Sequence, residues 1–256
     1  MADRDPAPFF SRPFLDLLRG QARVIGRPVD LVWMLVGLAV GWWLYVPAHE
    51  LLHVAGCLLA GGEVSRLEVD PLYGGVLLAR LFPFVVPGGD YAGRLAGFDT
   101  GGSDWVYLAT DLAPFVLTVF PGVWLFRLAA RRRATGLVAA AAPCALAPLL
   151  SLTGDAYEIG SLVVTEMAPW RAEEYRPLVA DDLLLQATTL ARGGSELPPG
   201  GLAWAGVVAA GVLGALWAFA TYGLASLVAA ALSQRPLLAG SWTGTAVEEP
   251  AVGTAR

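Results

Sequence analysis

The chain has 256 residues, of which 56 % are hydrophobic and 15 % are charged. It is too apolar and too poor in charge to be an ordinary soluble domain. The formal net charge is −5 and no basic stripe exists outside short loops, which excludes nucleic acid as a general partner. Cys57 and Cys144 both lie in apolar stretches, so we interpret them as small buried side chains and not as a disulfide or a ligand pair.

The apolar residues are grouped into runs, and a helix of roughly 20 such residues crosses a bilayer. Runs that begin at Leu31 and at residues 105, 134 and 201 predict an all-α polytopic membrane protein with about four transmembrane helices. We divide the chain into an N-terminal interfacial segment (1–30), a membrane core (31–165), a polar extramembrane segment (166–200), a C-terminal transmembrane helix (201–232) and a disordered tail (233–256).

Residues 9–27 have the pattern of an amphipathic helix. Spacing places Arg12, Asp16, Arg19 and Arg23 on one face, whereas Phe10, Phe14, Leu17 and Leu18 gather elsewhere. Such a helix lies on a surface of anionic lipid. A poorly ordered leader is the alternative interpretation.

The first apolar run is longer than one crossing needs, and it contains Pro47 two residues before His49. Proline removes a backbone donor and kinks or locally opens a helix. The kink either frees space beside the histidine or ends the lipid-spanning part. Ala60-Gly61-Gly62 is a natural helix stop.

Residues 63–103 differ from the rest of the core. They mix alternating polarity, β-branched residues and Gly-Gly or Pro-Gly turns. This pattern predicts a small β-hairpin or a re-entrant strand segment after the first span. Non-helical backbone at membrane depth requires partners from protein or from a wet cavity.

The only two histidines form a His-Glu-x-x-His motif, His49-Glu50-Leu51-Leu52-His53. Residues four apart share one face of a helix, so both imidazoles can bind one ion. Zinc held by two histidines and a carboxylate keeps a position for water, and Glu50 is the candidate catalytic base. Two random histidines fall four apart in roughly one chain in a hundred. The alternative is a histidine pair at the lipid–water boundary, with Glu50 reaching toward water.

A third ligand is needed, and Asp155 is the best candidate. His49 lies 18 residues after Leu31, and Asp155 lies 21 residues after Ala134. These separations are roughly 27 Å and roughly 31 Å of helix, so parallel spans bring the side chains to a similar depth. The alternative for Asp155 is an exposed helix cap.

Two further acids remain open at this point. Glu158, one turn after Asp155, could replace it as a ligand or lie beside the ligands and support them. Asp111 is an ionisable residue within the second apolar run, where a charge is energetically unfavourable. It either pairs with an arginine, lies in the cavity or faces the site.

With these pieces the chain resembles the site-2 protease family of intramembrane zinc metalloproteases. The matching features are the motif at 49–53 in a membrane helix, a glycine-rich turn, a strand-like segment at 64–79 and a later span that ends in Ala-Pro-Leu-Leu-Ser-Leu-Thr-Gly-Asp-Ala-Tyr-Glu-Ile-Gly, residues 147–160. In that family the third ligand is an aspartate that precedes a glycine. Here Pro148 and Asp155 match this stretch, Gly154 precedes the aspartate, and the usual asparagine is not evident.

The resemblance implies a zinc endopeptidase whose metalloprotease-like core covers residues 31–165. Its ligands would be His49, His53 and Asp155, its base would be Glu50, and its cofactor would be Zn²⁺. Its substrate would be a membrane protein cleaved in or near a transmembrane segment of the bilayer, with the bacterial cytoplasmic membrane as the expected location. The strands at 64–79 would offer an edge to an extended substrate.

Two expectations about orientation conflict. With a cytoplasmic N-terminus the inner segments hold 11 arginines and the outer segments hold 6. The inner set is Arg4, Arg12, Arg19, Arg23, Arg27, Arg127, Arg131, Arg132, Arg133, Arg235 and Arg256. The positive-inside rule therefore places the motif near the outer face, whereas members of the resembled family keep zinc nearer the cytoplasm.

Two other classes of function remain. A non-catalytic membrane scaffold or partner-binding relative would keep the fold without proteolysis. A transporter would use Asp111 and the glycine-rich last span, and would not depend on Glu50. The number of histidines excludes histidine-box oxygenases and desaturases, since they need many more than two.

Overall fold

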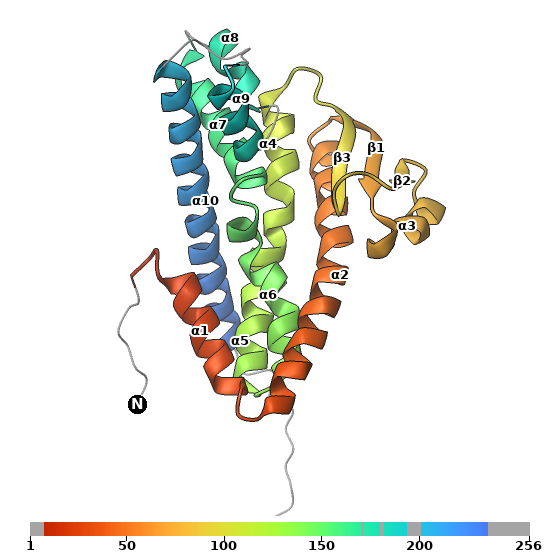
Figure 1. The fold of residues 1–256 in the computed structure, drawn as a ribbon, viewed down its shortest axis with the longest axis vertical. Helices are drawn as coiled ribbons and strands as arrows, with labels where there is room; N and C mark the ends of the chain where they lie inside the picture. Colours follow the sequence, from red (N-terminus) through yellow and green to blue (C-terminus); the bar gives the residue numbers. More distant parts are fainter. Residues whose placement is uncertain (1–7, 170–171, 180–181, 194–200, 235–256) are drawn as a thin grey trace, which may run out of the picture.

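The computed structural model describes residues 8–169, 172–179, 182–193 and 201–234. It has four helical stretches long and apolar enough to span a membrane, Pro28–Leu59, Asp104–Arg131, Thr135–Met167 and Gly201–Ser233. A small three-stranded sheet follows the first of them (Figure 1). The predicted all-α polytopic fold with a strand segment after the first span is therefore confirmed.

The first span is one continuous helix, α2 (Pro28–Leu59), which does not end at Pro47. Its start is capped by Asp30, whose Oδ2 accepts from the backbone N–H groups of Gly26 and Arg27 at 2.9 and 2.8 Å. It stops where predicted, because Gly61 adopts a φ of +97°, which favours glycine. The same rigid helix therefore carries the whole motif.

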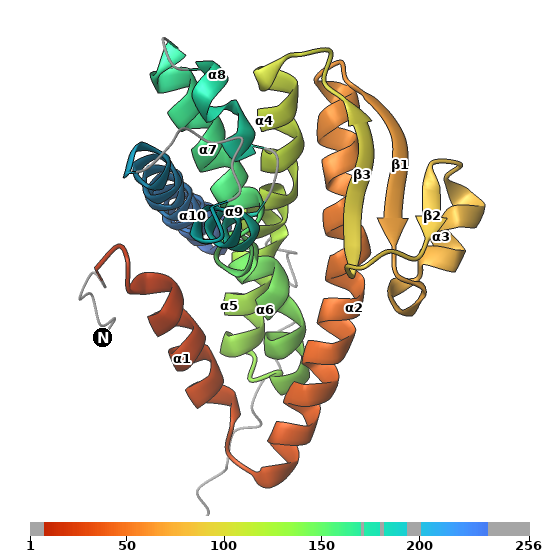
Figure 2. The ribbon, with the colours of Figure 1, turned by 45° about the horizontal axis from the view of Figure 1, so that its top comes forward.

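The sheet has the order β2-β1-β3 and lies beside the upper part of α2 (Figure 2). β1 (Glu63–Val69) pairs in parallel with β2 (Val85–Pro87) and antiparallel with β3 (Gly93–Asp99). Leu67, Val69 and Val85 are buried in one cluster with Val54 of α2. This cluster fixes the sheet against the helix that bears the histidines.

The strand-like segment predicted at 64–79 is wrong in its second half. β1 ends at Val69, and a 3₁₀ turn, η1 (Pro71–Tyr73), leads into a short helix, α3 (Gly75–Leu81). Leucine, alanine and arginine in α3 have high helix propensity, and this preference exceeds the strand preference of the β-branched residues nearby. The expected free edge in this segment is also wrong, because β1 is the central strand and is paired on both sides.

The second and third spans are both interrupted. The second comprises α4 (Asp104–Leu112), η2 (Ala113–Phe115), η3 (Thr118–Gly122) and α5 (Val123–Arg131). The third comprises α6 (Thr135–Leu150) and α7 (Asp155–Met167), so the stretch after residue 153 begins a new helix. Asp155 therefore stands at a helix start in the interior of a span.

Small residues bring the spans together. A Cβ atom on Gly37 or Gly41 of α2 would overlap the backbone of Gly136 or Ala140 of α6. Small residues four apart let helix backbones touch in this way, and they replace the hydrophobic effect that is absent in lipid. The contact fixes the height of α2 relative to α6.

The last span, α10 (Gly201–Gln234), also packs closely against α7 through small residues. A Cβ atom on Gly160 of α7 would overlap Ala210 of α10, and one on Gly214 of α10 would overlap Ala156 of α7. Ala156 directly follows Asp155. The last span therefore buttresses the helix turn that carries the acid, which matches the close packing that its glycine content suggests.

The N-terminal amphipathic pattern forms a helix, α1 (Arg12–Val24). Asp16, predicted to share a polar face with the arginines, points into the bundle, where its Oδ2 accepts from Arg127 at 2.6 Å and from the Tyr222 hydroxyl at 2.9 Å.

The polar segment predicted at 166–200 contains α8 (Ala172–Tyr175), η5 (Arg176–Val179) and α9 (Leu183–Ala191). Apart from residues 233 and 234, the tail predicted to be disordered lies outside the described residues.

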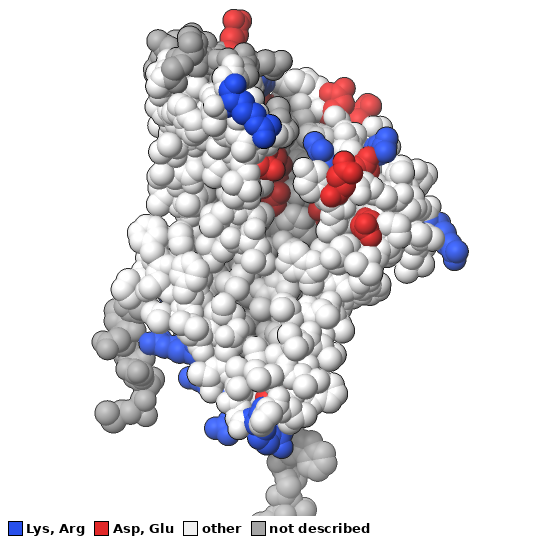
Figure 3. Space-filling view, in the orientation of Figure 1, with Lys and Arg blue, Asp and Glu red and all other residues white. Residues whose placement is uncertain are grey.

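Charge is distributed unevenly between the two ends of the molecule. Basic side chains gather where α1 meets α2 and where α5 meets α6, which includes Arg23, Arg27 and Arg131 to Arg133, whereas the end that carries the sheet has both acidic and basic side chains (Figure 3). From the positive-inside rule we expect the arginine-rich end to face the cytoplasm and the sheet end to face the opposite side.

Cysteine labelling tests this orientation. In a background of Cys57→Ala and Cys144→Ala, we expect Asp99→Cys at the sheet end to react with an impermeant maleimide on intact cells. Arg132→Cys at the basic end is expected to react only after permeabilisation. The reverse pattern of labelling would assign the opposite orientation.

Candidate metal centre

Both histidines of α2 are 8 % exposed and face each other, with their Nε2 atoms 3.1 Å apart. His53 Nδ1 lies 2.9 Å from the backbone carbonyl oxygen of Thr110. A carbonyl only accepts, so Nδ1 carries a proton, and in the neutral imidazole Nε2 presents a lone pair. His49 Nδ1 lies 3.0 Å from the Tyr45 hydroxyl, which can accept from the same tautomer.

Asp155 completes the group from the start of α7. Its Oδ2 lies 3.2 Å from His49 Nε2, and its Oδ1 lies 3.6 Å from His53 Nε2. One ligand atom from each of the three residues lies within 4.8 Å of the others. The alternative of an exposed helix cap is wrong, because the Asp155 side chain is only 17 % exposed and points at the imidazoles.

These separations suit a shared divalent cation. Zinc binds histidine nitrogen and carboxylate oxygen at about 2.0–2.2 Å, so two ligands of a tetrahedral ion stand about 3.3–3.5 Å apart. Asp155 Oδ2 is buried and receives no aligned hydrogen bond from the described residues, which is costly for a carboxylate oxygen unless a cation neutralises it. Two imidazoles and one carboxylate form the donor set of a catalytic zinc site.

Local structure explains the convergence. Tyr45, His49 and His53 follow at four-residue intervals on one face of α2. The break between α6 and α7 turns the chain so that Asp155 begins a helix at the depth of this face. The close contact of α2 with α6 fixes that depth.

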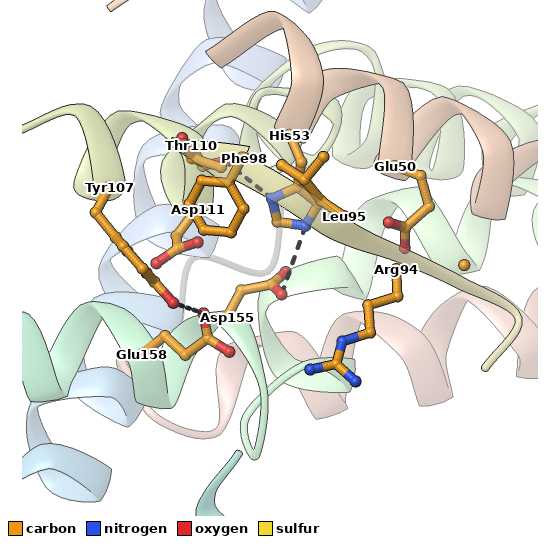
Figure 4. Close-up of a pocket in the computed structure, with 11 residues that line it drawn as sticks. Glu50, His53, Arg94, Leu95, Phe98, Tyr107, Thr110, Asp111, Asp155 and Glu158 are labelled. Carbon is orange, nitrogen blue, oxygen red and sulfur yellow. Dashed lines mark hydrogen bonds and ion pairs between the residues drawn. The ribbon is translucent and has the colours of Figure 1, made fainter. Parts of the chain in front are cut away.

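A cavity of about 190 Å³ opens beside the three ligands (Figure 4). It lies among α2, α4, α7 and β3, and its lining residues are Glu50, His53, Gly93, Arg94, Leu95, Phe98, Tyr107, Thr110, Asp111, Asp155 and Glu158. Glu50 is 8 % exposed and lies next to the first strand residue, Gly93. The candidate base and two of the candidate ligands therefore share one cavity.

The structure assigns positions to the two acids that the sequence left open. Asp111 lines the cavity and makes no ion pair with an arginine among the described residues. Glu158 also lines it and accepts from the Tyr107 hydroxyl at 3.2 Å. Neither belongs to the three-residue group around the histidines, so each lies beside the candidate ligands and not among them.

Several site residues were not anticipated. Tyr45 was detectable, since it lies four residues before His49 on the same helix face. Thr110 contacts His53 through its backbone carbonyl, and a contact of this kind cannot be predicted from a pattern of side chains. Gly93 and Arg94 enter the cavity through strand pairing, which the sequence left unspecified.

No protein-family model, curated protein or solved structure matches the chain significantly. Its chemistry therefore has to be inferred from its own geometry.

Metal content tests the ligand set. We expect the purified protein to hold about one zinc ion and the His49→Ala and Asp155→Ala variants to lose it, because each removes one of three protein ligands. Elemental analysis of protein purified in detergent measures this. Glu158→Ala is the matched control, one turn later on α7, and should retain the metal. Loss of zinc in Glu158→Ala, together with full occupancy in Asp155→Ala, would reassign the third ligand.

Proposed function

We propose that the protein is a membrane-embedded zinc metalloendopeptidase of the site-2 protease type. Its substrate is a membrane protein, cleaved in or near a transmembrane segment. The observation that carries the proposal is the convergence of His49, His53 and Asp155 beside a cavity that Glu50 also lines. Four spans with an internal polar cavity agree with a substrate that reaches the site from the bilayer.

The residues have distinct roles in this proposal. A zinc ion bound by the three ligands would polarise the scissile carbonyl and lower the pKa of a water molecule. The Glu50 carboxylate accepts the proton of the attacking water and passes it to the departing amine. Thr110 and Tyr45 fix the orientation of the two imidazoles through their Nδ1 atoms.

The edge that receives substrate is β3 and not the segment at 64–79. β3 pairs with β1 on one side, and four of its residues, Gly93, Arg94, Leu95 and Phe98, line the cavity. A helical peptide hides its amides in internal hydrogen bonds, so it has to become extended before hydrolysis. An edge strand beside the metal can pair with the extended stretch.

The Glu50→Gln variant tests the endopeptidase directly. Glutamine cannot accept the proton, so cleavage should fall by about 10²- to 10⁴-fold while zinc content stays unchanged. The measurement is turnover of fluorogenic transmembrane peptides in proteoliposomes, with zinc determined on the same sample. Equal cleavage by the variant, or a zinc-loaded wild type that cleaves no peptide in a broad panel, would favour the non-catalytic relative.

The Gly93→Ala variant tests the position of Glu50. A Cβ atom at residue 93 would overlap Glu50 Cγ and lie 2.7 Å from Cδ and 2.9 Å from Oε1. Displacement of the base by about 1 Å is expected to lower turnover by about 10²-fold, with zinc retained. Ala96→Val is the control, because this exposed residue of β3 does not line the cavity. Unchanged turnover in Gly93→Ala would show that the contact with residue 93 does not position Glu50.

A further inference from the structure

The cavity has a second group of polar residues that the proposed hydrolysis does not use. We call Tyr107, Asp111 and Glu158 the acidic wall. Figure 4 shows them on one side of Asp155, whereas Glu50 and Arg94 lie on the other side. Tyr107 and Asp111 come from α4, and Glu158 comes from α7 one turn after Asp155.

Asp111 is the residue that points to a ligand. It is 3 % exposed, it lines the cavity, and its Oδ2 has no hydrogen-bond partner among the described residues. A buried carboxylate oxygen without a partner is costly, most of all inside a membrane span. A cationic group that enters the cavity would offset this cost.

The acidic wall suits an organic cation better than a second metal ion. The described residues contain one group of three His, Cys, Asp or Glu ligands close enough to hold an ion, and it is the group around His49. The wall offers two carboxylates and a phenol hydroxyl, which together match the several N–H donors of an ammonium or a guanidinium. The one basic residue among the described lining residues, Arg94, lies across the cavity.

We propose that the acidic wall is a specificity subsite for a lysine or arginine side chain of the substrate. The proposal rests on the proposed endopeptidase function for the position of the scissile bond. Glu158 and Asp155 are three residues apart on one helix, so their Cβ atoms are about 5–6 Å apart. A long basic side chain next to the scissile bond spans that distance. Asp111 directly follows Thr110, whose carbonyl holds His53.

The test uses matched fluorogenic transmembrane peptides. Each carries lysine or its uncharged isostere norleucine at one of three positions on either side of the cleaved bond. A charged hydrogen bond contributes about 1.5–3 kcal/mol, so at one position wild type should prefer lysine by about tenfold or more in kcat/KM. Asp111→Asn and Glu158→Gln should reduce that preference, each with zinc content unchanged. Glu166→Gln, on the same helix but outside the cavity, should keep the preference.

A binding measurement separates this subsite from the proposed function. Fluorescence anisotropy with the Glu50→Gln protein reports peptide affinity without cleavage. Lysine-dependent binding that Asp111→Asn abolishes would support the subsite even if wild type cleaved no peptide. Equal cleavage and equal binding of both peptides would overturn the subsite and leave the endopeptidase standing. A second zinc equivalent that disappears in Asp111→Asn would overturn it in favour of a metal.

Discussion

The structure depends on the placement of one buried carboxylate, that of Asp155, against two imidazoles inside an apolar bundle. A carboxylate at this depth is unfavourable by itself, and both histidines turn their Nε2 atoms toward it. With His53 Nδ1 committed to the Thr110 carbonyl, a lone pair of its Nε2 and the oxygens of Asp155 point at a common centre. Lone pairs that face one another repel, and a divalent cation turns that repulsion into coordination. The three residues therefore form a candidate metal-binding group.

Small residues hold that arrangement in place. In lipid, apolar side chains gain little by leaving their surroundings, so close backbone contact carries the packing. Gly37 and Gly41 let α2 lie on α6, and the Gly160 and Gly214 contact clamps α7 on α10. The first contact sets the height of the histidines and the second sets the position of the turn that begins at Asp155. The second of these interfaces directly adjoins Asp155, so the packing of small residues sets the positions of side chains that line the cavity.

The sequence predicted the parts of this arrangement that follow from local rules. Hydropathy located the four spans, Gly61 marked the end of α2, and the spacing of His49 and His53 placed both on one helix face. The estimate that Asp155 and His49 lie at a similar depth on parallel spans indicated Asp155 as the third ligand. What it missed depends on pairing over long distances: the central position of β1, the helix at Gly75–Leu81, the inward turn of Asp16 and the carbonyl of Thr110. A backbone carbonyl has no sequence signature, and the partner of a strand is chosen by tertiary packing.

The uneven distribution of charge bears on how water reaches the site. Arginines cluster at the end where α5 meets α6, whereas the cavity opens among α2, α4, α7 and β3 toward the sheet end. At the other end the glycine contacts between α2 and α6 bring backbones together, and the cavities beside this contact are lined mainly by apolar side chains. At the sheet end β3 packs beside α2, and strand backbone within a membrane requires polar partners or water. The acids of the cavity therefore lie in the part of the bundle that adjoins the sheet, and the positive-inside rule leads us to expect that part on the non-cytoplasmic side.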